Sequence, residues 1–392
     1  MTGVNPIAPR NSSVADIKII DVFAIVLSLS FAEFIPIVGT LPFKLLLFFS
    51  VILILVNEGS KKRLKLDVES VAIFLFGCVC FYSNIRHNGD IAWSKNCLNI
   101  ITISVFSYLC RSSCSEKPLL YFTLTSSSWI WISLFNVVAT LGFKGADMSL
   151  HLLLCGYDNG LGSFLLPIYC LNLFYIHRGI HKQYFTAVSF AIFFQLLLRW
   201  TATALAGFVI VTVASAVFIF WRHSRKSLLL LLTAVLIFVV VFIIYLKIYD
   251  FGPIKWLITS VFHKSMDFSG RTVLWDIGFR LFEHSPILGI GRNGEYQILV
   301  FLGVPAAHNF LIDILDCSGA IGMGLFFIAF CNLDWRLRSE RGGFFLCCFL
   351  CLLIAAQFES YSAYQGYPLY FLVMNLAASG LMLDESHLFT DA

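Results

Sequence analysis

Long apolar segments recur along the whole of this 392-residue chain. Residues 201–220, TATALAGFVIVTVASAVFIF, contain no charged side chain, and about 20 apolar residues in a helix are enough to cross the hydrocarbon core of a bilayer. Only 13% of the residues are charged, and the mean hydropathy is +0.84. Because lipid cannot satisfy the hydrogen bonds of an open backbone, segments of this length predict an all-α, polytopic membrane protein.

Twelve segments have the composition of membrane spans. Together they predict about 12 transmembrane helices in a single integral membrane domain, residues 1–392. The spans are expected at residues 18–38, 41–57, 69–84, 96–110, 119–140, 159–176, 184–199, 201–220, 227–249, 307–332, 344–357 and 367–383.

The loops between these segments differ in charge. The loops after even-numbered spans are EGSKKRLKLD, RSSCSEKP, HRGIHKQ, WRHSRK and LDWRLRSERGG, and they hold 14 of the 27 Lys and Arg residues. Since basic loops stay in the cytoplasm, both chain termini are expected there. The opposite, extracytoplasmic face would then carry the turn at Arg199, the large loop 250–307 and the segment 357–368.

Composition also excludes several classes of function. The basic residues are dispersed among short loops, which does not favour binding of nucleic acid. Most of the twelve cysteines lie inside apolar segments, including the CFLC sequence at 348–351, so they are expected to be buried apolar side chains. No DxD pair lies on the expected outer face and no His/Cys cluster has metal-ligand spacing, so neither a metal nor a cofactor is expected.

The span at 307–332 begins with a titratable side chain, His308, followed by Asn309. On a continuous helix Gly319 would lie about 20° and Gly322 about 40° from His308, so the glycines would form a stripe against a neighbouring helix with His308 above it. In that position His308 could act as a base in a cavity that opens outward. The alternative is a histidine at the lipid interface.

The two aspartates of the same span point elsewhere in this arrangement. Asp313 would lie about 140° and Asp316 about 80° from His308 around the helix. His308 is therefore the catalytic candidate of this segment.

A second candidate, Arg199, ends the span 184–199, and the next span begins almost at once. An arginine in so short a turn lies close to membrane depth, where charged side chains are commonly functional. The alternative is an arginine whose stem lies along lipid while its charge reaches the headgroups.

The large loop is expected to contain a short amphipathic helix from Arg271 to about His284, with Ser269 as its N-cap and Pro286 beyond its end. Five apolar side chains would let this helix lie in the membrane interface. They are Val273, Leu274, Trp275, Phe279 and Phe282.

Two arginines of this helix, Arg271 and Arg280, are nine residues apart and so point to opposite sides. Arg280 has Asp276 and Glu283 within one turn, which favours local ion pairs. Arg271 has no acidic residue three or four positions later, and it lies at the helix N-terminus, where backbone amides favour an anion. Arg271 is therefore the anion-binding candidate, and Arg292, in the glycine-rich turn GIGRNG, is a second one.

The last outer segment, QFESYSAYQGYP, adds Glu359, Tyr361 and Tyr364 as possible substrate-binding residues, beside Asn309 and Arg292. Its aromatic side chains can form a platform for sugars or a belt at the membrane interface.

Arginines and a histidine on one face of a membrane protein suit one kind of chemistry. Guanidinium groups bind phosphate oxygens in pairs, and a histidine can accept the proton of an attacking hydroxyl. Together, the arginines and the histidine suit a reaction in which a lipid-linked diphosphate is displaced from a sugar.

The order of these motifs resembles that of the O-antigen ligase and O-antigen polymerase superfamily. The resemblance lies in LLRWTATALAGF, then GRTVLWDIGFRLFEHSPILGIG, then HNFLIDILDCSGAIG, and it covers roughly residues 195–325, inside an expected catalytic core at 184–332. It implies that Arg199 and Arg271 bind the diphosphate and that His308 is the catalytic residue.

The resemblance also implies a multi-pass glycosyltransferase of the bacterial inner membrane with its active site facing the periplasm. Its substrate would be a glycan linked to undecaprenyl diphosphate, and it would use neither metal nor nucleotide sugar. A flippase and a chain-length regulator of the same pathway would be its possible protein partners.

Three functions fit these expectations to different degrees. A polymerase of O-antigen or capsular repeat units is favoured, because the segment between Arg271 and His308 is short for the recognition of a bulky acceptor. A ligase that transfers the glycan to lipid A core is the alternative. A flippase or transporter of polysaccharide would show repeated halves, broken helices and ionisable residues within the membrane. No convincing repeat is evident, and ionisable residues are sparse at the centres of the spans.

Overall fold

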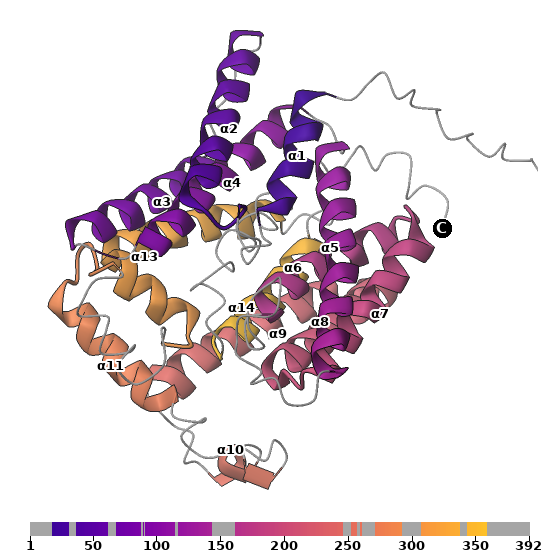
Figure 1. Cartoon of the computed structure of the whole chain (residues 1–392). Coiled ribbons are helices and arrows are strands. Elements are labelled where there is room, and N and C mark those ends of the chain that lie inside the picture. The colour runs from indigo at the N-terminus through magenta and orange to yellow at the C-terminus, as the bar shows by residue number, and fades with distance from the viewer. Residues whose placement is uncertain are drawn as a thin grey trace, which may run out of the picture.

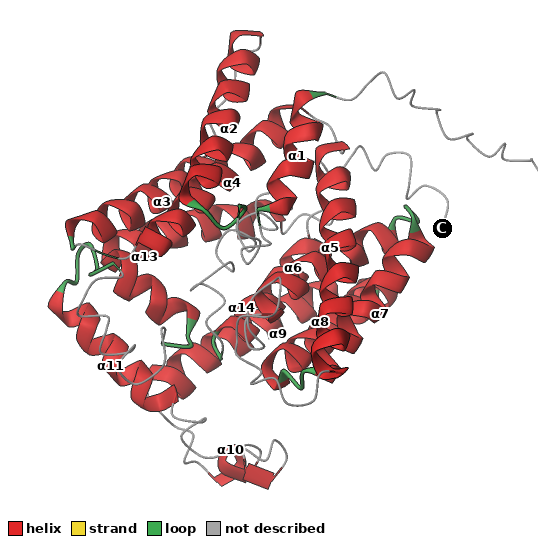
Figure 2. Cartoon of the chain, viewed as in Figure 1, coloured by secondary structure: helices red, strands yellow, loops and turns green. Residues whose placement is uncertain are grey.

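The computed structural model describes residues 18–30, 37–61, 68–87, 89, 91–113, 117–142, 161–245, 252–256, 259–260, 271–291, 307–337 and 343–358. Within these ranges the regular elements are helices (Figures 1 and 2). The main ones are α1 (Ile19–Leu29), α2 (Leu41–Lys61), α3 (Val68–Arg86), α4 (Ile91–Ser113), α5 (Lys117–Gly142), α6 (Leu161–His177), α7 (Lys182–Leu198), α8 (Ala202–Phe220), α9 (Arg225–Phe238), the π-helix η4 (Val239–Tyr245), α10 (Gly252–Trp256), α11 (Arg271–His284), α13 (Phe310–Leu337) and α14 (Gly343–Ala356).

Helices overlap eleven of the twelve expected spans, and the last, residues 367–383, lies outside the described residues. Six helices are long and apolar enough to cross a bilayer, namely α2, α3, α5, α8, α9 and α13, while α1, α6, α7 and α14 are apolar but shorter. The described chain is thus an all-helical, multi-pass membrane protein. The expected number of twelve spans, and the side on which each terminus lies, stay predictions.

The helices form two groups (Figure 1). In the first, α13 packs along α3, α3 packs on α4, and α4 packs on α2. In the second, α6 packs on α7 and α8, and α14 packs on α8 and α9. The groups meet where α1 contacts α5 and where α13 contacts α14.

The helix α14 lies at the centre of the second group. Its sequence, GFFLCCFLCLLIAA, has no charged side chain, and all fourteen residues are buried. A helix that is apolar on every side belongs in a protein interior. The three cysteines of this helix are buried small side chains, as expected for the CFLC segment.

The two ends of α8 mark the membrane surfaces. Its 19 residues correspond to about 28 Å of helix, close to the thickness of a hydrocarbon core. The tryptophan before the helix, Trp200, is 74% exposed, and the one after it, Trp221, is 64% exposed. Exposed tryptophan collects at both interfaces of a bilayer, so this pair brackets the membrane-spanning length of α8.

Three contacts fix how α14 lies against α8. A Cβ atom at Gly207 would lie 3.2 Å from that of Ala355, and Ser215 Oγ lies 3.6 Å from Cys348 Sγ. A Cβ atom at Gly343 would lie 2.7 Å from the Phe218 ring. The numbers fall along one helix as they rise along the other, so the helices are antiparallel. The C-terminus of α14 therefore lies at the Trp200 end of α8.

The expected straight span at 307–332 is wrong, because α13 is broken at Gly319. This residue has φ 62° and ψ −161°, far from helical values, and the helix bends there (Figure 1). The half before the break, residues 310–318, is about 14 Å long and too short to cross a membrane. The half after it, residues 320–337, is about 27 Å long, and α13 packs mainly along α3.

The turn after α11, residues 285–291, fills this break. The backbone N–H groups of Ala320 and Ile321 donate to the carbonyl oxygens of Pro286 and Ile287 at 2.8 and 3.1 Å. In the other direction, Ile290 N–H donates to the carbonyl oxygen of Asp316 at 2.7 Å. Backbone groups that a helix break leaves without partners are costly inside a membrane protein, and here the turn supplies those partners.

The same turn also contacts α3. Ser83 Oγ donates to the carbonyl oxygen of Gly289 at 3.1 Å, and a Cβ atom at Gly291 would lie 2.6 Å from Asn84 Cα. Only glycine allows backbones to approach so closely. The described glycines of this turn, Gly289 and Gly291, therefore let it join α3, α11 and α13.

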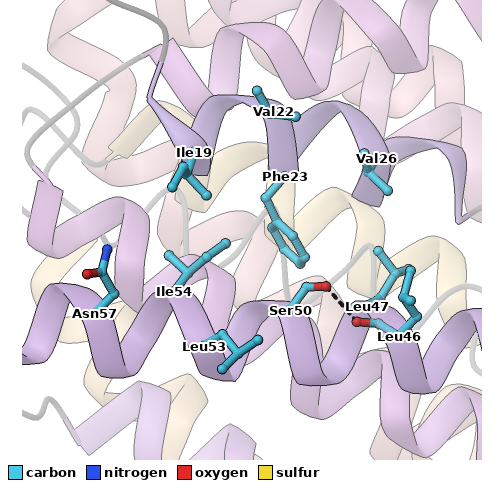
Figure 3. Close-up of a pocket in the computed structure, with 10 residues that line it drawn as sticks. All are labelled: Ile19, Val22, Phe23, Val26, Leu46, Leu47, Ser50, Leu53, Ile54 and Asn57. Atoms are coloured by element: carbon cyan, nitrogen blue, oxygen red, sulfur yellow. Dashed lines mark hydrogen bonds between the residues drawn. The ribbon is translucent and has the colours of Figure 1, made fainter.

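An apolar groove runs between α1 and α2 (Figure 3). It is lined by Phe23 and Val26 from α1 and by Leu47 and Ile54 from α2. These two helices lie at the far end of the molecule from α11 in Figure 1. A lining of this kind suits lipid chains, and the groove holds none of the candidate catalytic residues.

The break in α13 predicts that a single methyl group added at Gly319 lowers the stability of the protein. Gly319→Ala would place a Cβ atom 2.5 Å from backbone atoms of Ile287 and Gly289, at a positive φ that alanine rarely adopts. We expect the variant to lose at least about 2 kcal/mol of stability, measured by thermal unfolding in detergent. Gly324→Ala is the matched control, because a Cβ atom there meets nothing within 4 Å. Equal melting temperatures for the two variants would contradict the described break.

Candidate functional site

The segment before α13 holds His308 in a tight turn. His308 has φ 51°, in the left-handed region, and it lies outside the helix, which begins at Phe310. The side chain is partly buried. A non-glycine residue in this region costs free energy, and the surrounding structure has to hold it there.

Asn309 caps α13. Its Oδ1 accepts hydrogen bonds from the backbone N–H groups of Leu311 and Ile312, both at 3.0 Å. Its Nδ2 donates to the carbonyl oxygen of Gln357 at 2.9 Å, and Asn309 is fully buried. An asparagine at this position is a frequent helix start, and here it also ties α13 to the end of α14.

The expected glycine stripe below His308 is wrong for a physical reason. Angles around a helix apply only to residues of one continuous helix, whereas His308 precedes the helix and Gly319 breaks it. Gly319 meets Ile287 and Gly289 of the turn, not a neighbouring helix. Gly322, beyond the break, does face a helix, since a Cβ atom there would lie 3.4 Å from the Phe76 ring of α3.

Asp313 contacts this turn, although the helical angle expected for it pointed away from His308, and Asp316 packs against α11. The carboxylate of Asp313 accepts a hydrogen bond from the backbone N–H of Ala307 at 3.1 Å. Asp316 packs beside Gly278 of α11, where a Cβ atom would lie 3.2 Å from its Oδ2. Both aspartates are fully buried.

The helix α11 has the bounds expected from the sequence, but it does not lie freely in the membrane interface. Leu274, Trp275 and Leu281 are buried, and of the five apolar side chains only Val273 is strongly exposed. Gly278 brings the helix onto α13, because a Cβ atom there would meet Ile312. The apolar side chains of α11 thus serve packing within the protein.

Trp275 belongs to a small buried cluster that joins four elements. The cluster brings together the π-helix η4, the helix α11, the start of α13 with the residue before His308, and Phe358, two residues past the end of α14. Its members are Val239, Ile244, Trp275, Ala307 and Ile312, with Phe279 and Phe358 packed against them. We call it the Trp275 cluster, and it holds the chain next to His308.

Arg271 lies one turn before Trp275 on α11 and on nearly the same face, about 40° away. It is partly buried, whereas Arg280 is exposed. The nine-residue spacing thus separates the two arginines as the sequence predicts. Arg271 is the arginine on the side of α11 that packs toward the start of α13.

Arg199 ends α7 in a three-residue turn. Its backbone N–H donates to the carbonyl oxygen of Gln195, and Trp200 follows with φ 48° before α8 begins. Gln195 is buried and anchors this end of α7 to α5, since Ser133 Oγ donates to its Oε1 and its Nε2 donates to the carbonyl oxygen of Ile130. The turn is thus short, as expected, and held firmly.

The described contacts place the three candidates at the same end of the bundle. The antiparallel α14 ends at the Trp200 end of α8, which is where Arg199 lies. Asn309, next to His308, binds the carbonyl oxygen of Gln357 just past the end of α14. The Trp275 cluster brings α11, with Arg271, to the same place.

Four other candidates, Arg292, Glu359, Tyr361 and Tyr364, lie outside the described residues. Asn309 is committed to hydrogen bonds within the protein. Sequence reasoning gave no role to Asp313 or to Gln357, although both hold the turn at His308. An asparagine preceding the helix was the available signal, because an N-cap at Asn309 would have placed His308 outside the helix.

Comparison with known proteins gives a match to a family model. Residues 187–327, from α7 to α13, match a family model described as O-antigen ligase, and this region contains Arg199, Arg271 and His308. No curated protein matches the chain significantly. The resemblance seen in the motifs is thereby confirmed over residues 187–327, which are similar to the O-antigen ligase family.

Proposed function

We propose that the chain transfers a glycan from a polyprenyl diphosphate to a sugar hydroxyl, with His308 as general base. The acceptor oxygen bonds to the anomeric carbon of the donor while the bond from that carbon to the diphosphate oxygen breaks. The hydroxyl proton passes to the imidazole of His308, and the lipid diphosphate leaves. Arg199 and Arg271 hold the diphosphate through their guanidinium groups.

The shared location of the three residues is the observation that supports this most. Arg199 adjoins Trp200, whose exposure is typical of a tryptophan at a membrane interface. The diphosphate of a lipid-linked glycan lies at the same depth, between the tail in the bilayer and the sugars in water. His308 and Arg271, at the same end of the bundle, are suited to meet the bond between sugar and phosphate.

The basic loops favour the periplasm as the side on which this end lies. In a bacterium with two membranes, the protein would then act at the outer surface of the inner membrane. Its substrate would be an undecaprenyl-diphosphate glycan delivered there by a flippase, and a chain-length regulator would be a further partner. Neither metal nor cofactor has a part in the proposed reaction.

Polymerisation is the finer proposal. Thirty-six residues separate Arg271 from His308, and α11 and the following turn are packed against α3 and α13. A segment so short, whose described part is packed in this way, offers little surface for a large acceptor such as lipid A core. Ligation is the second candidate, because the matching family model is described as O-antigen ligase.

A broken helix is a feature of many transporters, and α13 has one. In transporters the break opens onto a cavity and its free backbone groups bind the cargo or an ion. Here those groups bond to Pro286, Ile287 and Ile290 of the turn. The break is therefore better explained as a docking place for the turn.

Replacement of His308 by asparagine tests the base. Asparagine adopts a positive φ more readily than most residues, so the turn should persist while the imidazole is lost. We expect the rate of glycan transfer to fall about 10²- to 10⁴-fold, measured with a purified lipid-linked donor. The amount of His308→Asn protein in the membrane is measured as the control for expression. A full-length glycan ladder in cells that carry this variant would contradict the role of His308 as the base.

The two arginines of α11 form a matched pair. Arg271→Lys keeps the charge but loses the two-pronged contact with phosphate, so transfer should fall about 10- to 100-fold. Arg280→Lys, on the exposed side of the same helix, should leave the rate within about twofold. An equal loss in both variants would show that the face of α11 does not determine diphosphate binding.

Deletion of the gene in its host separates the candidate functions. Loss of a polymerase leaves lipopolysaccharide capped with a single repeat unit, or no capsule. Loss of a ligase leaves bare core together with accumulated lipid-linked polymer. We expect the first pattern, and lipid-linked repeat units held at the cytoplasmic leaflet would instead indicate a transporter.

A further inference from the structure

We propose that Asp313 is a positioning residue for His308, an inference that rests on the proposed function. The hydrogen bond from Ala307 N–H to Asp313 Oδ1, at 3.1 Å, closes a ring of chain around His308 and Asn309. His308 lies inside that ring with a positive φ. The bond therefore sets the direction in which the imidazole leaves the backbone.

Helix capping does not explain this bond. The first-turn N–H groups of Leu311 and Ile312 are already accepted by Asn309 Oδ1. Asp313 instead reaches backward, past the start of α13, to a residue outside the helix. A carboxylate that only favoured the helix dipole would need no such contact.

Burial supports the same conclusion. Asp313 is fully buried, and placing a carboxylate in a protein interior costs much free energy unless hydrogen bonds compensate. An apolar side chain would fill the space at lower cost. The acceptor oxygen is thus the property that this position requires.

Both neighbours of His308 are fixed independently of it. On one side, Ala307 is bonded to Asp313 and packed in the Trp275 cluster. On the other side, Asn309 is bonded to the end of α14. Because the backbone is held at both neighbours, a small shift of Ala307 after loss of its bond to Asp313 would rotate the imidazole of His308. A displacement of about 1 Å in an active site can lower the rate about 10²-fold.

The test compares Asp313→Leu with Asp313→Asn. Leucine removes the acceptor at similar volume, and we expect kcat for glycan transfer to fall about 10²-fold, with KM for the lipid-linked donor within about threefold. Asparagine keeps an acceptor oxygen for Ala307 N–H, so its kcat should stay within about fivefold of the parent. Glu283→Leu, an exposed acid on α11, is the control for loss of a carboxylate and should leave both constants unchanged.

Rates are referred to protein that elutes as a single species in detergent. If Asp313→Leu is not recovered folded, Asp313→Ser takes its place, because its shorter side chain cannot reach Ala307, and the same fall in kcat is expected. A parental kcat in the leucine or serine variant would overturn the inference, and so would equal loss in the asparagine and leucine variants.

The outcome for His308 separates this inference from the proposed function. If His308→Asn is inactive and Asp313→Leu is fully active, only the positioning role is lost. If His308→Asn keeps the parental rate, the proposed base is lost, whatever Asp313→Leu does.

Discussion

The backbone hydrogen bonds between the 285–291 turn and the break in α13 are the interaction on which the rest of the site depends. They let a membrane helix stop, change direction and continue without leaving its N–H and carbonyl groups unsatisfied. The direction change allows the first half of α13 to cross from α3 to the end of α14. His308 stands at the beginning of that half, so its location follows from the break.

Glycine makes this interaction possible at two facing positions. Gly289 and Gly319 both have positive φ; a Cβ atom at Gly319 would meet the backbone of Ile287 and Gly289, and one at Gly289 would meet the backbone of residues 316–318 just before the break. On one side the turn is continuous with α11, which carries Arg271. On the other it touches Ser83 of α3. One turn of backbone therefore sets the mutual position of an arginine, a histidine and the first helix group.

Much of this molecule could be predicted from sequence because single helices depend on local pattern. The bounds of α11 agree with the expected 271–284, and the short turn at Arg199 agrees with two apolar runs that almost touch. The bend in α13 could not be predicted in the same way. The sequence GAIG is typical of a closely packed, continuous helix. The break in α13 at this point is stabilised by residues about thirty positions earlier in the chain. For the same reason Asp313 was given no role, since its contact with Ala307 exists only where the helix has not yet begun.

The tryptophans at the two ends of α8 have a consequence for the membrane in which the protein works. Exposed tryptophans favour the two interfaces of a bilayer, so they would keep Arg199 near the headgroups. Because α14 packs along α8, this helix would not tilt alone. In a thicker or thinner bilayer the lipid phosphate would move along the normal while the guanidinium stayed with the protein. If Arg199 binds the donor diphosphate as proposed, hydrophobic mismatch would change the fit between the protein and its donor without any change in the candidate residues, and acyl-chain length would become a determinant of activity.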